Sequence, residues 1–221
     1  SSAASDVYKR QELACGGGFF NAGQMCSATS RVLVADSLAD EFLQRLQVRA
    51  EGIHVADPFA EDVEMGALIN RAQYQRVQAH IQRGIEDGAR LLCGGERPAA
   101  LATGFFIRPT VFTEVPLDSA LWNEEIFGPV LCVRRFATED EAIALANDSD
   151  FGLVASVVSA DAGTAERVAN ALQAGLVWIN APQVIFPQTA WGGYKQSSIG
   201  RELGPWGLAA FQEIKHVIRS N

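Results

Sequence analysis

One cysteine of this chain stands in a setting that suits covalent chemistry. Cys26 lies in the run FFNAGQMCSATSR (residues 19–31), directly before the apolar run Val32–Val34. Small and polar neighbours of this kind leave a thiol accessible at the entrance of a strand. A thiolate adds to a carbonyl carbon, and cysteine is the nucleophilic side chain that needs the least activation. The alternative is a small buried hydrophobe, because free cysteine is among the residue types most often buried.

Two later segments also combine chemistry-bearing side chains with turn residues. The first is NEEIFGP (residues 123–129), in which Glu125 and Phe127 stand just before an apolar run. In open α/β sheets ligand sites gather at strand ends, and a carboxylate can accept both hydrogen bonds of a diol. The alternative is a solvated acidic turn with Phe127 in the core. The second segment is WGGYKQSSIGRELG (residues 191–204), whose spaced glycines indicate tight backbone turns.

The three segments resemble, in order and spacing, the signatures of the NAD(P)-dependent aldehyde dehydrogenases, and the resemblance runs from about Glu12 to Asn221. It implies that Cys26 is the catalytic nucleophile, which adds to an aldehyde and passes through a thiohemiacetal and a thioester. The Cys26 amide would be one donor to the oxyanion. The resemblance further implies that Glu125 binds the nicotinamide ribose hydroxyls and that Phe127 packs on the nicotinamide ring of NAD or NADP.

Within that family, the chain most resembles the betaine-aldehyde and aminoaldehyde dehydrogenases, through CSATSR (residues 26–31) and FPQ (residues 186–188). Their substrates are small cationic aldehydes, and a trimethylammonium group is attracted to an aromatic face by roughly 0.5–2 kcal/mol. The resemblance makes Phe20 and Trp191 candidate walls of the aldehyde pocket. The alternative for both is ordinary apolar lining. Ile185 is a further candidate, and it stands where many relatives place an aromatic, which removes one possible face of a cage.

Composition argues against several other classes of function. The 221-residue chain has a net charge of −8 and no cluster of lysine and arginine beside aromatics, so nucleic acid is not an expected partner. No apolar run approaches the roughly 18 residues of a membrane span. The four cysteines are widely spaced without a CxxC pair, so we expect reduced thiols and a cytoplasmic protein. His54, His80 and His216 lack metal-ligand spacing, and no metal site is expected.

The first half of the chain predicts alternating strands and helices. Residues 12–20 form a Gly-rich lead into the cysteine segment, and residues 31–35 form a strand. The next helix has Asp36 or Ser37 as its cap and an apolar stripe at every fourth position over Leu38–Leu46.

A second helix spans about residues 70–87, with Ile85 on its apolar face and Gly88 as a left-handed cap. Further apolar strands alternate with helices at residues 130–136, 153–159 and 176–180. Strands that are apolar on both faces and alternate with helices are the mark of a parallel sheet with right-handed crossovers. We therefore expect an α/β chain, and by the resemblance the parallel-sheet catalytic domain of the aldehyde dehydrogenase fold.

We expect three parts along the chain. SSAASDVYKRQ (residues 1–11) resembles the translation of a sequencing-library adapter, so we expect an artefact there. Residues 12–207 would be the catalytic domain. Residues 208–221 would be a β-arm that, by the resemblance, adds to a neighbouring subunit of a homodimer or homotetramer.

The resemblance also places parts of the family's site outside this chain. These are the N-terminal cofactor domain, the Glu-Leu-Gly-Gly-Lys segment with the general base, and the asparagine that completes the oxyanion hole. We therefore expect the 221-residue chain to be inactive alone. The alternative to an oxidoreductase is a non-catalytic partial domain limited to subunit contacts. A cysteine hydrolase fits less well, because no histidine is recognisably matched to Cys26.

Overall fold

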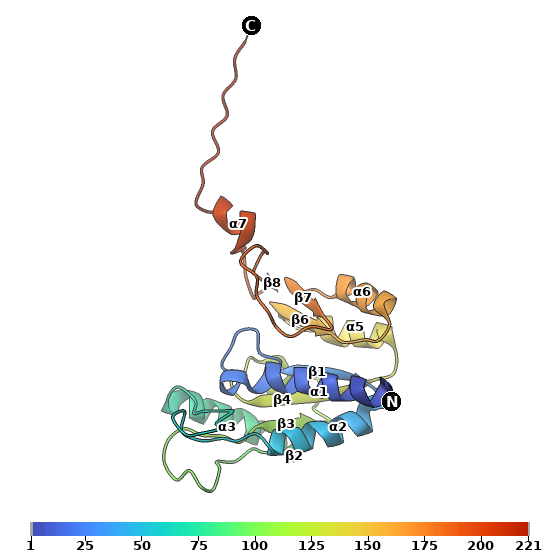
Figure 1. Ribbon diagram of the computed structural model, residues 1–221, viewed down its shortest axis with the longest axis vertical. Coiled ribbons are helices and arrows are strands. Elements are labelled where there is room, and N and C mark those ends of the chain that lie inside the picture. Colours follow the sequence, from blue (N-terminus) through green and yellow to red (C-terminus); the bar gives the residue numbers. More distant parts are fainter. Residues whose placement is uncertain (1, 221) are drawn as a thin grey trace. The chain divides into compact units, whose positions relative to one another are not determined.

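Short apolar strands and amphipathic helices alternate along the chain and form two units (Figure 1). The computed structural model describes residues 2–220, with the backbone alone for residues 2–9. The first unit ends at Asp148 and the second begins at Ser149. Cys26, Glu125 and Phe127 all belong to the first unit.

A four-stranded sheet with the order β1-β4-β3-β2 forms the centre of the first unit. Its strands are β1 (Arg31–Ala35), β4 (Val130–Phe136), β3 (Thr110–Thr113) and β2 (Arg90–Cys93). β1 and β3 both pair with β4 in parallel, with Arg31 opposite Cys132 and Thr110 opposite Val130, which confirms the predicted parallel sheet. β2 pairs with β3 in the antiparallel direction, which the sequence pattern does not predict.

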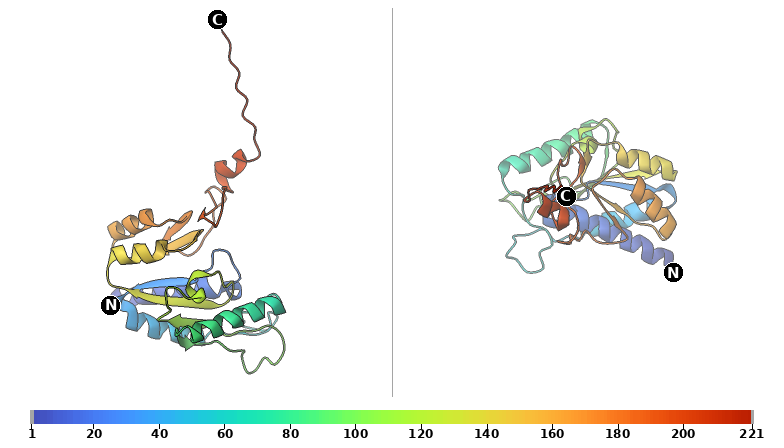
Figure 2. Two further views of the ribbon diagram at one scale, coloured as in Figure 1. Left: turned by 180° about the vertical axis from the view of Figure 1, so that it is seen from behind. Right: turned by 90° about the horizontal axis from the view of Figure 1, so that it is seen from above.

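Helices cover both faces of this sheet. They are α1 (Ser2–Phe19), α2 (Asp36–Glu51), α3 (Arg71–Glu86), α4 (Ala120–Asn123) and α5 (Glu139–Asn147). α1 and α2 lie on one face and α3 on the other (Figure 2). The core between these layers contains β3 and the first four residues of β4, which are buried throughout. Strands buried on both faces are what the continuous apolar runs predicted.

α2 forms where the sequence pattern predicts it, but it begins differently. Phe42 and Leu46 of the predicted stripe are buried. The N-cap is Ala35, and no side chain caps the helix, so the predicted cap at Asp36 or Ser37 is wrong. Asp36 is already the first helical residue, where its negative charge favours the positive end of the helix dipole.

α3 begins and ends as predicted. The Asn70 side chain accepts a hydrogen bond from the Gln73 amide at 2.9 Å, and Gly88 has the left-handed φ of +92° expected of a helix cap. Val77 is buried, but Ile85 is 44% exposed, so the buried face of α3 is shorter than predicted.

The Gly-rich residues that lead into the cysteine segment are helical, since α1 continues to Phe19. A Cβ atom on Gly18 would lie 2.6 Å from Leu131 Cδ2, so glycine here permits a close approach of helix and sheet rather than a flexible loop. Local sequence does not show this use of glycine, because it depends on what the helix faces. α1 also spans residue 11, and the proposed boundary there stays a prediction.

The second unit contains a smaller parallel pair of strands. Its elements are β5 (Phe151–Gly152), β6 (Val154–Val157), α6 (Ala162–Ala171), β7 (Leu176–Ile179), β8 (Tyr194–Lys195) and α7 (Gly204–Ala209). β6 and β7 pair in parallel with α6 between them in sequence, as predicted for this strand–helix–strand segment. β5 and β8 pair in the antiparallel direction. Residues 213–220 form no helix or strand in this structure, so the predicted β-arm is unpaired here.

The turn that leads to Cys26 has an unusual backbone. Asn21, Ala22 and Gly23 have φ values of 51°, 55° and 70°, and left-handed residues rarely follow one another. A Cβ atom on Gly23 would overlap the carbonyl oxygen of Gly128. The backbone of the cysteine segment therefore lies directly against the backbone of the 123–129 segment.

We expect Gly23→Ala to destabilise the chain by at least about 2 kcal/mol, because it adds left-handed strain to a backbone clash. Gly66→Ala is the matched control, since a Cβ on Gly66 meets nothing within 4 Å. Urea unfolding of both variants measures the difference. Equal stabilities of the two variants would show that the close approach of Gly23 and Gly128 is not a constraint.

Candidate active site

Cys26 is the exposed cysteine among the four, and it lies on the turn just before β1. Two hydrogen bonds anchor the segment that follows it. The Thr29 amide donates to Gly17 O at 3.0 Å, and the Cys132 amide donates to Ser30 O at 2.8 Å. The adjacent Ser27 is buried at 3% exposure. The residues that follow Cys26 are therefore fixed to α1 and β4, while Cys26 itself is exposed.

The predicted ribose and nicotinamide contacts lie on the segment that enters β4. Glu125 is exposed, Ile126 is buried, and Phe127 is half-buried with a left-handed φ of 56°. This alternation turns Glu125 outward and anchors the segment through Ile126. A Cβ atom on Gly128 would lie 2.5 Å from Val77, so the segment also packs closely on α3.

The sheet topology brings these two segments together. Cys26 precedes β1 and Phe127 precedes β4, and the two strands are adjacent and parallel. The amino ends of adjacent parallel strands lie at the same edge of a sheet, so the segments that enter them are neighbours. The contact of Gly23 with Gly128 confirms this juxtaposition. An accessible thiol, a carboxylate and an aromatic ring thus share one edge of the first unit.

The structure adds residues that the sequence analysis did not single out. The Arg31 guanidinium donates to Asp148 O at 3.0 Å and lies over the Trp122 ring at 4.4 Å, which fixes the start of β1. Its burial lowers the pKa of Arg31 from the usual value. Gln73 and Arg76 of α3 donate to backbone carbonyls of the Glu125–Phe127 segment. No local signal identifies these partners, because each contact joins residues far apart in the sequence.

The predicted substrate residues fall in both units. Phe20 is 66% exposed, and it lines a small pocket of about 140 Å³ together with Cys15, Arg49 and Glu64. In the second unit, Ile185 is 45% exposed. Trp191 is half-buried, and its backbone exchanges two hydrogen bonds with Glu202 at 2.8 and 2.7 Å. The role of these three side chains as walls of an aldehyde pocket stays a prediction.

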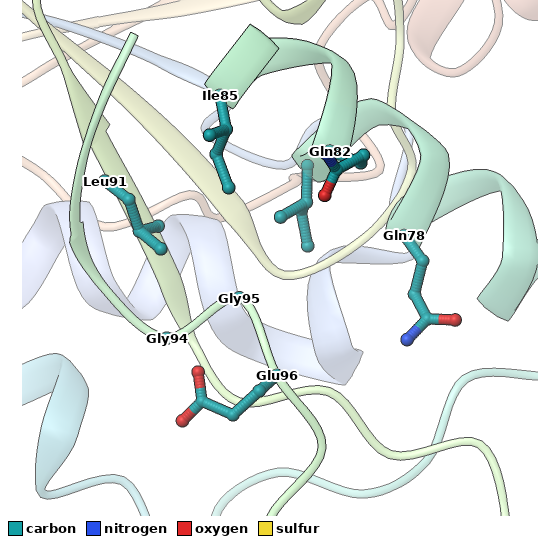
Figure 3. Close-up of a pocket in the computed structure, with 8 residues that line it drawn as sticks. Gln78, Gln82, Ile85, Leu91, Gly94, Gly95 and Glu96 are labelled. Carbon is teal, nitrogen blue, oxygen red and sulfur yellow. The ribbon is translucent and has the colours of Figure 1, made fainter.

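A separate cavity of about 370 Å³ lies between the C-terminal half of α3 and the end of β2 (Figure 3). Gln78, Gln82 and Ile85 reach it from the helix, and Leu91 and Glu96 reach it from the strand and the loop beyond. None of the predicted site residues lines this cavity. The candidate site is therefore defined by the two loops at the sheet edge and not by this hollow.

Among the described residues, no group of three or more histidine, cysteine or acidic side chains could hold a metal ion. Within the same part of the chain, no helix is both long and apolar enough to span a bilayer.

Burial divides the four cysteines into two kinds. Desolvation raises the pKa of Cys15 and of Cys132 to about 12, and the pKa of Cys93 to about 11. Each of these three thiols is buried and stays protonated near neutral pH, whereas Cys26 is exposed. A reagent that attacks thiolates should therefore distinguish Cys26 from the other three.

We expect a single fast-reacting thiol when the folded chain meets an aromatic disulfide reagent at about pH 8, because only an accessible thiolate attacks it. Absorbance of the released thiol counts the reacting groups. The Cys26→Ala variant should lose the fast phase, and unfolding it in urea should release the other three. A fast phase that survives in this variant would contradict the assignment.

Comparison with known proteins agrees with this geometry. The family model described as "Aldehyde dehydrogenase family" matches residues 2–217. Aminoaldehyde dehydrogenase ALDH10A8 of Arabidopsis thaliana is 47% identical over 212 residues, which are 96% of this chain and 42% of the relative. Betaine aldehyde dehydrogenase of Amaranthus hypochondriacus is 45% identical over 214 residues, which are 97% of this chain and 43% of the relative.

Solved structures show the same fold. Betaine aldehyde dehydrogenase (betB) from Staphylococcus aureus, in complex with NAD+, superposes with a TM-score of 0.91 at 45% identity, and covers 93% of this chain and 41% of its own. A mutant form of aldehyde dehydrogenase from Bacillus cereus gives a TM-score of 0.92 at 40% identity, with 95% and 42% covered. The chain thus spans less than half the length of the relatives it matches. With nearly its whole length matched in sequence and in fold, the chain belongs to the aldehyde dehydrogenase family.

Proposed function

We propose that the protein carrying this chain oxidises an aldehyde to a carboxylate with NAD(P)+, and that Cys26 is its nucleophile. The observation that supports this proposal is the exposed Cys26 thiol on a turn that lies against the Glu125–Phe127 segment. Membership of the family supports the reaction class. The betB relative binds NAD+, which makes NAD+ the first cofactor to test, with NADP+ as the second.

The chemistry of the cysteine follows from its position. The Cys26 thiolate adds to the aldehyde carbon, a C–S bond forms, and the carbonyl π electrons move to oxygen. The Cys26 amide is our candidate donor to that oxyanion. When bound, NAD(P)+ supplies the two-electron acceptor that converts this adduct to a thioester. Water then attacks the thioester carbon, the C–S bond breaks, and the carboxylate leaves while the Cys26 thiolate is restored.

The residues of the 123–129 segment fit a nicotinamide nucleotide. Glu125 presents an exposed carboxylate, which can accept both hydroxyl hydrogens of a ribose diol. Phe127 is half-buried, and an aromatic ring with part of its area exposed suits a planar partner such as nicotinamide. We propose that these two side chains orient the nicotinamide end of the cofactor beside Cys26.

For the substrate, we propose a small cationic aldehyde of the betaine-aldehyde or aminoaldehyde type. The relatives with 45–47% identity carry these activities in their names. Phe20 and Trp191 are the proposed aromatic walls, which would attract a quaternary ammonium group by roughly 0.5–2 kcal/mol. Ile185 is the proposed third wall, and it contributes apolar area without a ring face.

A second candidate is that the 221-residue chain alone is a partial domain without turnover, since it spans only about 42% of its relatives' length. The isolated chain tests the second candidate directly, because stoichiometric NAD+ binding by the chain alone would count against a purely structural role.

We also propose a cytoplasmic location, because reduced thiols are typical of that compartment and all four cysteines are unpaired.

Replacing Cys26 tests the proposed reaction. In the full-length protein carrying this chain, Cys26→Ala should lower kcat/KM for betaine aldehyde by at least about a thousandfold, because no covalent adduct can form. Cys93→Ala is the matched control, since Cys93 is buried on β2 and should leave turnover within about twofold. The absorbance of the NADH formed measures both. If Cys26→Ala keeps more than about 3% of the activity of the unmodified protein, the assignment of Cys26 as the nucleophile is wrong.

We also propose that the C-terminal arm joins subunits of a homodimer or homotetramer. Phe211, Ile214, Val217 and Ile218 are 77–100% exposed on residues that form no helix or strand in the single chain. Unpaired backbone groups can form hydrogen bonds with the edge of another sheet, and the exposed apolar side chains would be buried by that contact. Both features suit an arm that adds as a strand to the sheet of a neighbouring subunit.

Deleting residues 210–221 from the full-length protein should therefore yield monomers, because the backbone hydrogen bonds and apolar contacts of the arm are lost. Light scattering coupled to size exclusion measures the mass. As a control, charge changes at the exposed Glu41 of α2 should leave the assembly intact. An unchanged oligomer after the deletion would show that the arm is not the interface.

A further inference from the structure

One face of α3 holds the backbone of the segment that carries Glu125 and Phe127. Gln73 Nε2 donates to Ile126 O at 3.0 Å and to Phe127 O at 2.8 Å. One turn further along the helix, Arg76 Nη2 donates to Glu125 O at 2.6 Å. Three consecutive carbonyls of the segment are thus bound by two side chains at positions i and i+3 of one helix, which share a helix face.

The Gln73 contacts act on a strained residue. Phe127 has a left-handed φ of 56°, a conformation that costs a residue with a side chain roughly 1–2 kcal/mol. Such a conformation persists only where its surroundings determine it. The Gln73 amide group holds the carbonyls on both sides of the Phe127 Cα, so it fixes the two peptide planes between which that φ is set.

A third contact fixes the start of the segment. His80 Nε2 lies 3.1 Å from Glu124 Oε2, and His80 Nδ1 lies 2.9 Å from Arg76 O. The Glu124 amide in turn donates to Ala120 O at 2.9 Å, at the end of α4. Glu124, the residue before the Glu125–Phe127 segment, is therefore held through its side chain and its backbone amide.

Close packing at Gly128 fixes the backbone at the end of the segment. Gly128 packs so closely on α3 that a Cβ would lie 2.5 Å from Val77, and its carbonyl lies against Gly23. Gln73 is itself fixed, because its amide donates to the Asn70 cap at 2.9 Å. A shift of the first turn of α3 would therefore move the backbone that carries Glu125 and Phe127.

We propose that Gln73 and Arg76 are positioning residues, which hold the Glu125–Phe127 backbone so that the carboxylate and the ring are presented to the nicotinamide end of the cofactor. This inference rests on the proposed function, in which Glu125 and Phe127 bind the cofactor. Neither α3 side chain needs to touch substrate for this role. Their effect passes through three backbone carbonyls.

The test uses the full-length protein with Gln73→Met and Arg76→Met, which keep much of the side-chain volume and remove the donors. Arg76→Lys restores a donor and is the conservative rescue. Gln75→Met is the matched control. Gln75 is exposed on the same helical turn, so its replacement makes the same glutamine-to-methionine change at a position away from the segment. Hydrogen exchange without cofactor reports on residues 124–130, and NAD+ titration reports affinity.

We expect both methionine variants to speed exchange of residues 124–130 and to weaken NAD+ binding about tenfold, the size expected for the loss of one or two hydrogen bonds. The labelling rate of Cys26 and the KM for the aldehyde should stay within about threefold, and Arg76→Lys should recover most of the affinity, because only the cofactor segment is released. Gln75→Met should change neither exchange nor affinity.

Unchanged exchange in both methionine variants would overturn the inference, whatever happens to the kinetics. Faster exchange with unchanged NAD+ affinity would also overturn it, provided that Glu125→Gln weakens binding, and would leave the proposed function standing. If Glu125→Gln leaves NAD+ affinity unchanged, the proposed role of Glu125 itself fails and the positioning role falls with it. The Glu125→Gln arm therefore separates failure of the inference from failure of the proposed function.

Discussion

The close approach of Gly23 to the carbonyl of Gly128 is the constraint on which the candidate site depends. No side chain larger than hydrogen fits between the two backbones, and Gly23 must also adopt a left-handed φ. The contact sets the separation between the turn that carries Cys26 and the segment that carries Glu125 and Phe127. The proposed cooperation of Cys26 with Glu125 and Phe127 requires that this separation be fixed, because catalysis by positioning is sensitive to small displacements.

The helices on the two faces of the sheet support this contact from opposite sides. α1 approaches β4 through Gly18, and its Gly17 carbonyl accepts the Thr29 amide behind the cysteine turn. On the other face, α3 packs on Gly128 through Val77 and binds the neighbouring carbonyls through Gln73 and Arg76. Rigid elements thus hold each loop, and loops held by rigid elements are where binding residues are commonly found. The left-handed Phe127 is tolerated because its surroundings determine it.

Burial accounts for the chemical difference among the cysteines. Cys132 lies in the fully buried start of β4, where desolvation raises its pKa to about 12, while Cys26 lies on an exposed turn. The same residue type is thus a buried packing group in one place and an accessible thiol in another. The buried Cys15 lines a small pocket together with Phe20, next to the cysteine segment. Burial raises the pKa of Cys15, so its thiol stays protonated and unreactive despite this position.

The sequence by itself determined the strands at residues 31–35 and 130–136, the approximate span of α3 with its cap at Gly88, and the identity of Cys26, Glu125 and Phe127 as candidates. These features are local, because apolar periodicity, capping and turn chemistry act within a few residues. Tertiary structure alone decided the rest. The helix through Gly16–Gly18, the antiparallel direction of β2, the missing side-chain cap of α2 and the carbonyl contacts of Gln73 and Arg76 all depend on what lies opposite in space. The meeting of Gly23 with Gly128 joins positions far apart in the chain, and only the parallel pairing of β1 with β4 brings them to one edge of the sheet.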